Sequence, residues 1–512
     1  MRRDVGDASV GEALAPPNPR TRRQTLWQRF LCLDQRRLLA LLIFLALFGY
    51  NFARPTDIDF WWHLKTGELI ATTGAIPAAD PFSYTVPGQP WVAHEWLWEL
   101  AIYQIYTWGG YALAAILSAV AVTLTYLILY RLLRRLGSNE FVAAALVLWA
   151  AMLAFPGVGV RPRELTQLLL AFFLSRLFLY REGHVRSLWS LPPLMVLWVN
   201  VHGQFILGLG LLGLFAIEEV ANRLFAGGRS PRHMLVVCLA TLAACVNPSG
   251  LAMLRYPIDY YLRGENPSFA MVTEFQSPDF HQPLYLAFAV SLLLLAVLPR
   301  SLNRRTVLEA LLVAVFTLQA LVSVRQIAAY TMVVAPLIAL RLTDRFKIVR
   351  ELPPSSVPRP LLALNWLIML AVVAMGTAYA SQPTMSERLQ LGREPLIGSL
   401  PIAGARFIED KGLPDPVFHE QTWGGYLIYQ WYPQRRVFMD GRVDMYGAAV
   451  SREYMSVVSV RPDWNAILDK YGVRTILIQK DSPLSTLLLT DGEWERVFEG
   501  NVEAVFVREG DH

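Results

Sequence analysis

Two aspartates stand at the end of the first apolar run of the chain. The run ends near Ala53, and the next residues read PTDIDFWWHLK, which contains Asp57 and Asp59. A carboxylate inside a bilayer costs about 2.5–3.5 kcal/mol on insertion scales, and such residues usually serve a function. A carboxylate can also take a proton from a reacting group or bind a ligand. We therefore interpret Asp57 and Asp59 as catalytic or ligand-binding residues.

The tryptophans of the same stretch allow a second interpretation. Trp61 and Trp62 favour the headgroup level of a membrane, where indole rings are enriched. The segments 59–74 and 91–108 read as two amphipathic helices, and such a pair can act as a membrane anchor with no catalytic role. The two interpretations differ in whether the polar faces of these helices meet a ligand.

The polar residues of the two segments share helix faces. Asp59 and His63 are four residues apart, and so are Glu95 and Glu99. The string HEWLWE is not a zinc-protease motif, because Trp98 stands where the second histidine should fall.

The elements that must position these residues are membrane spans. The 512 residues are 54% hydrophobic and 17% charged, which is typical of a polytopic membrane protein. The net charge of +5 comes from arginines in loops, as membrane topology requires, and we expect no nucleic-acid partner. The three cysteines indicate neither a disulfide framework nor a metal knuckle. We expect about eleven spans, a number that follows from apolar runs long enough to cross the hydrocarbon. They fall near 37–53, 110–131, 141–157, 164–180, 187–201, 203–222, 233–247, 282–299, 306–323, 325–342 and 361–380.

Arginines occur in every second loop, and this alternation predicts the orientation. The arginine-bearing loops and a basic, disordered N-terminus (1–35) are expected in the cytoplasm. The transmembrane core covers 36–380, with a first outer loop at 54–108. Residues 385–512 then form a domain outside the membrane, where alternating helix and strand patterns, including a strand at 435–442, predict an α/β fold. The expected location is a bacterial cytoplasmic membrane.

This orientation collects acids, histidines, amides and arginines on the outer face. Besides the two aspartates, the expected site residues there are His63, His94, Glu95, Arg161, Arg163, Asn200, His202 and Arg325. For each arginine alone, an alternative role is to extend its side chain to the lipid headgroups. A lone histidine is often a packing residue. Their concentration on one side predicts a site at the outer membrane boundary.

The chain resembles the GT-C superfamily of membrane glycosyltransferases, especially members similar to protein O-mannosyltransferases and to lipid A aminoarabinose transferases. The resemblance lies in the acids that follow the first span, the long helical first outer loop, the many spans and the outer C-terminal domain. The chain looks closer still to uncharacterised bacterial multi-pass members that share the patterns DxDFWWHLxxG, DPFSYT and DGRxDMYG. It departs from the mannosyltransferases, because Asp-Ile-Asp replaces their adjacent Asp-Glu, and it lacks a WWDYG-type signature.

The resemblance implies transfer of a sugar from a polyprenyl-phosphate donor on the outer face, to a lipid, glycan or protein acceptor. Asp57 or Asp59 would then activate the acceptor hydroxyl, and arginines would bind the lipid phosphate. A divalent cation, Mg²⁺ or Mn²⁺, would have Asp57, Asp59, Glu274 and Asp279 as candidate ligands. Possible acceptor-binding residues in the outer domain are Trp423, Tyr426, Asp440, Arg442 and Asp444. An Asp–Arg turn that organises this domain is the alternative for the last three.

Two other function classes remain open at this stage. A transporter or flippase for a lipid-linked intermediate would need broken helices at mid-membrane depth, and Pro192-Pro193 is the candidate break. A non-catalytic assembly subunit for lipid-linked glycans would use the outer domain as its binding module.

Overall fold

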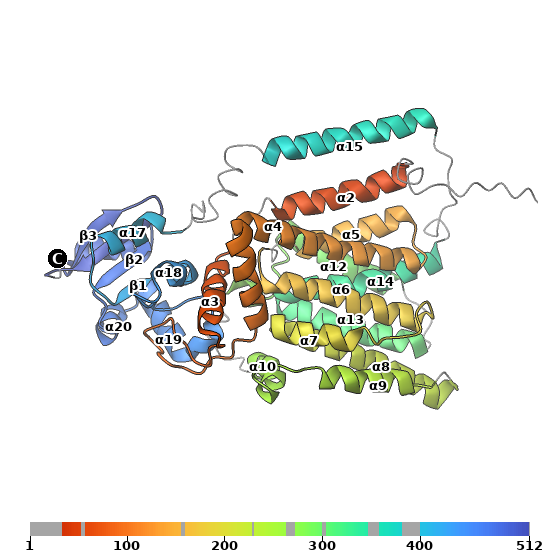
Figure 1. The fold of residues 1–512 in the computed structure, drawn as a ribbon, viewed down its shortest axis with the longest axis horizontal. Coiled ribbons are helices and arrows are strands. Elements are labelled where there is room, and N and C mark those ends of the chain that lie inside the picture. The colour runs from red at the N-terminus through yellow and green to blue at the C-terminus, as the bar shows by residue number, and fades with distance from the viewer. Residues whose placement is uncertain are drawn as a thin grey trace, which may run out of the picture.

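The computed structural model describes residues 33–52, 57–154, 159–227, 230–262, 272–298, 304–346, 358–380 and 400–510. The expected disordered N-terminus lies almost entirely outside these ranges. The first part of the described chain is a bundle of helices, and the last part is a small domain around a sheet at one end of the bundle (Figure 1).

A helix occupies each of the positions at which a span was expected. These helices are α2 (Gln35–Phe52), α4 (Trp96–Arg135), α5 (Glu140–Ala154), α6 (Pro162–Arg181), α7 (Leu191–Val201), α8 (Ile206–Ala226), α9 (Arg232–Ala243), α12 (Pro283–Val297), α13 (Arg304–Val322), α14 (Ile327–Arg345) and α15 (Arg359–Ala380). Within the described ranges, five helical stretches reach the length and hydropathy of a membrane span, and five apolar helices are shorter. The expected helical membrane core is confirmed, and the number of spans stays a prediction.

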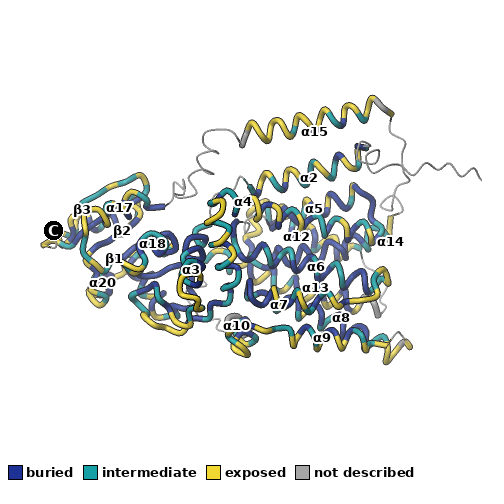
Figure 2. Tube along the Cα trace, in the orientation of Figure 1, coloured by how far each residue is buried: buried dark blue, intermediate teal, exposed yellow. Residues whose placement is uncertain are grey.

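Burial separates the centre of this bundle from its margin. Helix α14 lies inside the bundle, because 78% of its apolar 18-residue stretch is buried. Only 11% of the corresponding stretch of α15 is buried. Helix α15 runs beside α2 at the edge of the bundle, and most of its residues are exposed (Figure 2). The site described below is built on the buried helices and not on this margin.

The loop after α2 folds into α3 (Phe60–Thr73), as the segment 59–74 predicted. The second expected helix, 91–108, is the first part of α4, which is broken at Gly109 and Gly110. Gly110 has φ +62°, a backbone conformation that glycine adopts without strain. The break lets the first part of α4 lie against α3, while the second part runs along the bundle.

Helix α3 packs tightly on α4 at Gly67. A Cβ atom at Gly67 would collide with the Glu99 carbonyl group, so only glycine permits this approach. On each helix, residues three or four positions apart lie on the same face. This packing brings His63 of α3 beside Glu99 of α4, where their side chains hydrogen-bond.

The expected headgroup position of Trp61 and Trp62 is wrong, because both side chains are buried inside the protein. Trp61 packs on Tyr426 and Tyr429 of α18 (Gly424–Trp431), with ring centroids 6.1 and 5.0 Å away. The apolar face of α3 is therefore covered by the C-terminal domain.

The C-terminal domain has a four-stranded sheet in the order β1-β2-β4-β3. Its strands are β1 (Val417–His419), β2 (Thr475–Gln479), β3 (Trp494–Glu499) and β4 (Glu503–Arg508), and its helices are α17 (Ile402–Asp410), α18, α19 (Val443–Val458), α20 (Trp464–Lys470) and α21 (Pro483–Asp491). The β1–β2 pair is parallel and the other pairs are antiparallel. The predicted α/β domain is present, and β3 and β4 form an antiparallel hairpin.

The strand expected at 435–442 is wrong. Its backbone makes a bridge to Ser83, in the loop between α3 and α4, and does not join the sheet. Val437 donates to the Phe82 carbonyl at 3.0 Å and accepts from the Tyr84 amide at 3.1 Å. These bonds tie the C-terminal domain to the loop, and the next residues of the segment enter the site.

Candidate functional site

A cavity of about 570 Å³ lies where the loop after α2, the end of the bundle and the C-terminal domain meet. Six stretches of the loop and the bundle line it: the start of α3, the segment before α4, the start of α6, the turn between α7 and α8, residues 272–275, and the turn between α13 and α14. Helix α10 (Leu251–Leu262) and the C-terminal domain complete the lining. Volumes of this size suit a small-molecule or cofactor site. Two sets of charged side chains face it, and they differ in composition.

The first set, which we call the arginine cluster, contains Asp57, Asp59, Glu274, Arg161, Arg163 and Arg325. Arg161 pairs through Nε with Asp57, and its two terminal nitrogens lie 3.0 Å from Asp59 Oδ2 and 3.6 Å from Glu274 Oε2. Arg163 and Arg325 approach the same Glu274 carboxylate at 3.1 and 3.5 Å. Three carboxylates therefore meet three guanidinium groups.

Local backbone geometry positions the aspartates. Asp59 precedes the first residue of α3, and its backbone amide donates to Asp57 Oδ1 at 2.9 Å. The indole nitrogen of Trp62, one turn later, donates to Asp59 Oδ1 at 3.2 Å. A Cβ atom at Gly441 of the C-terminal domain would collide with this same oxygen. The Asp59 carboxyl is thus held between α3 and the C-terminal domain.

Burial and charge shift the acid groups of this cluster in opposite directions. Burial raises the pKa of Asp59 to about 6, although Arg161 opposes the shift. Burial also disfavours the charged form of Glu274, but Arg325 and Arg163 outweigh it and lower the pKa of Glu274. Asp59 therefore titrates near neutral pH, as a proton acceptor should.

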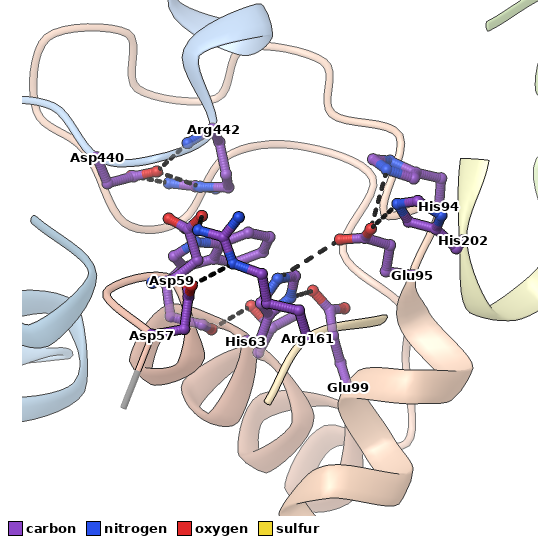
Figure 3. A network of polar contacts seen from close by, with 12 residues as sticks. Asp57, Asp59, His63, His94, Glu95, Glu99, Arg161, His202, Asp440 and Arg442 are labelled. Atoms are coloured by element: carbon purple, nitrogen blue, oxygen red, sulfur yellow. Dashed lines mark hydrogen bonds and ion pairs between the residues drawn. The ribbon is translucent and has the colours of Figure 1, made fainter. Parts of the chain in front are cut away.

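The second set, which we call the histidine cluster, contains His63, His94, His202, Glu95 and Glu99 (Figure 3). Glu95 lies among three imidazole Nε2 atoms, at 3.6 Å from His63, 3.6 Å from His94 and 3.4 Å from His202. His63 uses its other ring nitrogen, Nδ1, to hydrogen-bond Glu99 Oε1 at 3.1 Å. The His63 ring therefore lies between two carboxylates.

The remaining ring nitrogens of this cluster also have partners. His94 Nδ1 lies 3.1 Å from the Val92 carbonyl oxygen, which can only accept. His202 Nδ1 lies 2.8 Å from the hydroxyl of Thr166. Burial lowers the pKa of His63 to about 3, so its imidazole is neutral at physiological pH. The contacts of the Nδ1 atoms thus fix the orientation of each imidazole ring.

Arg442 of the C-terminal domain forms another wall of the cavity. It binds Asp440 at 2.5 and 2.9 Å and Asp80 at 2.9 Å, and all three side chains are buried. The guanidinium carbon lies 4.7 Å from the Trp91 ring centroid. The alternative of an Asp–Arg turn is therefore supported for this pair, and the turn also closes the cavity.

The structure brings most of the expected site residues together. Asp57, Asp59, His63, His94, Glu95, Arg161, Arg163, His202, Glu274, Arg325 and Arg442 all line the cavity. This grouping joins residues from seven separate stretches of the chain. It matches the expected convergence of polar residues at one end of the bundle.

Other expected site residues lie elsewhere. Trp423 and Tyr426 are buried in the C-terminal domain, so their ring faces cannot stack on a sugar. Asn200 accepts from Trp96 at 2.8 Å and from Asn247 at 3.1 Å, as a residue that ties helices together does. Asp440 is fully buried against Arg442 and Tyr446. The side chain of Asp444 lies outside the described part of the chain.

Glu99 lines the cavity and Asp80 binds Arg442 beside it, and neither was among the expected site residues. Asp80 accepts from the backbone amides of Phe82 and Ser83 and so forms the turn in the DPFSYT pattern. Glu99 carries a signal in the sequence, since it stands four residues after Glu95 on one helix face.

The expected Mg²⁺ or Mn²⁺ ligands do not fit a cation. Asp57, Asp59 and Glu274 already pair with guanidinium groups, so another positive charge would be repelled. Asp279 is an exposed carboxylate beside His281, and it does not line the cavity. Within the described residues, a set whose ligand atoms lie within 4.8 Å of one another is His63, Glu95 and Glu99.

Comparison with known proteins identifies the fold. No protein-family model matches the chain, and no curated sequence does. Among solved structures, the chain is similar to the oligosaccharyltransferase AglB from Archaeoglobus fulgidus, in complex with an inhibitory peptide and a dolichol-phosphate. The TM-score is 0.52 at 11% identity, over 89% of this chain and 70% of that one. The chain therefore has the GT-C fold, which confirms the predicted resemblance for the fold.

Two further structures match less well. The arabinofuranosyltransferase AftD from Mycobacteria has a TM-score of 0.49 at 13% identity, over 95% of this chain and 40% of that one. ArnT from Cupriavidus metallidurans, bound to undecaprenyl phosphate, has a TM-score of 0.35 at 11% identity, over 92% and 97%. Together with the apolar helices, the GT-C fold makes this chain a membrane protein.

Proposed function

We propose that the protein is a glycosyltransferase that moves a sugar from a polyprenyl-phosphate donor to a hydroxyl acceptor. The observation that carries the proposal is the arginine cluster: a carboxyl with a pKa near neutral lies beside three arginines in one cavity at the end of the bundle. The GT-C fold and the lipid phosphates bound to AglB and ArnT support the donor class. The acceptor is a lipid, a glycan or a protein.

Asp59 is the proposed base and Asp57 its positioning partner. The Asp57 carboxylate accepts from the Asp59 amide and pairs with Arg161, so it holds both residues in place. During transfer, the acceptor hydroxyl proton moves to the Asp59 carboxylate as the acceptor oxygen bonds to C1 of the sugar. The bond between C1 and the lipid phosphate oxygen breaks, and its electron pair leaves with the phosphate.

Arg163 and Arg325 are the proposed phosphate-binding residues. Both line the cavity, and both contact Glu274 through one terminal nitrogen, Nη1. A guanidinium group presents five N–H donors in a planar fork, which suits phosphate oxygens and stabilises the leaving group.

We further propose that transfer takes place on the outer face of a bacterial cytoplasmic membrane. The arginine-bearing loops at the opposite ends of the helices support this orientation through the positive-inside rule. The acceptor would enter beside Gln421, Thr422 and Arg442, which form the wall of the cavity that belongs to the C-terminal domain.

The test uses the purified full-length protein in nanodiscs. Synthetic short-chain polyprenyl phosphates that carry pentoses or hexoses are supplied with a bacterial membrane extract as acceptor, and release of polyprenyl phosphate is followed by mass spectrometry. Release is expected with at least one sugar, is lost in Asp59→Asn, and is kept in the matched control Asp279→Asn. Undiminished release in the Asp57→Asn/Asp59→Asn double variant would contradict the proposal. Binding of undecaprenyl phosphate without release from any donor would favour the transporter.

A further inference from the structure

We propose that the histidine cluster binds a divalent first-row transition metal ion such as Zn²⁺, with His63, Glu95 and Glu99 as protein ligands. The three side chains can each present one ligand atom within 4.8 Å of the other two. They come from α3, from the residue before α4 and from the first turn of α4, two elements locked together at Gly67. The site differs in position and in ligand chemistry from the cation site expected at the aspartates.

Charge is the first argument for a cation. Glu95 and Glu99 are both buried, and the groups placed against them are imidazoles. In the arginine cluster, by contrast, each carboxylate has a guanidinium partner. Buried carboxylates are stable when they are paired with a cation or coordinate a metal. A bound divalent ion would balance the two glutamates.

An unpartnered oxygen is the second and independent argument. Glu99 is only 1% exposed, and its Oε2 atom has no hydrogen-bond partner among the described residues. A buried polar oxygen without a hydrogen-bond partner costs free energy. Glu99 Oε1 is already used by His63, so Oε2 is the oxygen left for a further ligand.

The convergence of imidazole nitrogens on one carboxylate is a third argument. The Nε2 atoms of His63 and His94 each lie 3.6 Å from Glu95, and Nε2 of His202 lies 3.4 Å from it. Imidazole nitrogens and carboxylate oxygens are common ligands of first-row transition metals.

The surroundings also match those of metal ligands. Ligand histidines commonly donate their second ring nitrogen to a carboxylate, a carbonyl or another polar group, which fixes the ring. Here His63 is the proposed ligand, and its Nδ1 atom faces Glu99 Oε1 at 3.1 Å. His94 and His202 would hold the Glu95 carboxylate in place from the other side.

The ligand set selects the class of ion. Imidazole with carboxylate suits zinc and its first-row neighbours, whereas Mg²⁺ prefers an octahedral shell of oxygens. An ion at this place would add positive charge to the wall of the cavity. Metal binding is measured without any substrate, so its failure would leave the proposed sugar transfer untouched.

The experiment titrates the chelator-treated full-length protein in detergent with Zn²⁺, and with Co²⁺ as an absorbing probe. We expect one equivalent of metal per chain and no displacement by excess Mg²⁺. His63→Gln and Glu99→Gln should each weaken binding by about 100-fold or more, at or above the upper end for loss of an outer-shell partner. His281→Gln is the matched control, because it removes an exposed imidazole that also lies beside an aspartate.

A second control separates the two clusters. Asp57→Asn removes a carboxylate from the arginine cluster and should leave Zn²⁺ affinity unchanged. The melting curve of His63→Gln shows whether this variant folds. If it does not fold, the test uses Glu99→Gln, because glutamine keeps the shape of the glutamate side chain. Absence of saturable Zn²⁺ binding to the wild type, or equal binding to the wild type and both Gln variants, would overturn the proposal.

Discussion

The arginine cluster and the histidine cluster face the same cavity, but the charges of their carboxylates are compensated differently. In the arginine cluster, three acids meet three permanent cations. In the histidine cluster, two acids meet imidazoles, which are neutral when buried. In the arginine cluster, groups of the protein balance the charge of the carboxylates. In the histidine cluster, the proposed ion from solution balances it.

The difference also concerns where each cluster is built. The histidine cluster rests mainly on α3 and α4, which are locked by close packing at Gly67. The arginine cluster joins the start of α3, the start of α6 and two short turns, so it depends on how the bundle end is assembled. The proposed ion site is therefore built on a more closely packed pair of helices than the arginine cluster is.

The largest effect is expected from Asp59→Asn. Loss of a general base typically lowers a rate by about 10²–10⁴-fold, and this variant keeps the shape of the side chain while removing the proton acceptor. Donor turnover in nanodiscs should fall by that factor. The Zn²⁺ affinity of the histidine cluster should stay at the wild-type value, which would separate the two clusters. A wild-type turnover rate in Asp59→Asn would remove the base from the proposal.

Arg161→Met is expected to destabilise the fold. The side chain keeps much of its length but leaves Asp57, Asp59 and Glu274 without their shared cation. Removing one partner of a buried ion pair costs about 3–5 kcal/mol, and the partial exposure of this cluster places the expected loss near the lower end. The measurement is the denaturant dependence of unfolding in detergent.

Two variants calibrate this loss. Arg435→Met breaks the exposed pair with Asp415 and should cost no more than about 1 kcal/mol. Adding Asp57→Asn to Arg161→Met removes one of the stranded charges and should restore part of the stability. If Arg161→Met and Arg435→Met unfold at the same denaturant concentration, Arg161 is not the cation that holds the cluster together.

The sequence predicted the arginine cluster better than its surroundings. The acids after the first span and the arginines at helix starts carry signals in residue type and position, and the structure brings Asp57, Asp59, Arg161, Arg163 and Arg325 to one cavity. The apolar runs likewise predicted the helices, because long runs of this kind dominate local preference. These features depend on short stretches of the chain.

Features that depend on distant partners were not predictable in this way. The sequence around Trp61 is the same whether its side chain faces lipid headgroups or packs on α18. Only the tertiary contact with Tyr429 shows that it packs on α18. The segment 435–442 reads as a strand, yet its backbone partners are Phe82 and Tyr84 in another part of the chain. The histidine cluster needs His202, which joins it only through helix packing.

Arg325→Lys should weaken phosphate binding by about 10-fold. Lysine keeps the charge but loses the planar fork of donors, which sets the geometry of phosphate recognition. Binding of undecaprenyl phosphate in nanodiscs measures the effect, and Arg345→Lys at the far end of α14 is the matched control. Equal affinities for the wild type and Arg325→Lys would mean that Arg325 serves only as the partner of Glu274.

The arginine cluster should also give donor turnover a pH dependence, which is small near neutral pH. Asp59 must be ionised to accept a proton, and its pKa is raised to about 6 by burial, with Asp57 and Glu274 adding to the shift and Arg161 and Trp62 opposing it. Donor turnover should therefore be level above pH 6 and fall about tenfold per pH unit below it.

The effect of Asp59 on stability has the opposite sign. Because its pKa in the folded protein lies above the unfolded value, its contribution to stability is present at low pH and is lost as pH rises through 6. The residual turnover of Asp59→Asn should show no inflection near pH 6. An unchanged inflection in that variant would assign it to another group of the cavity.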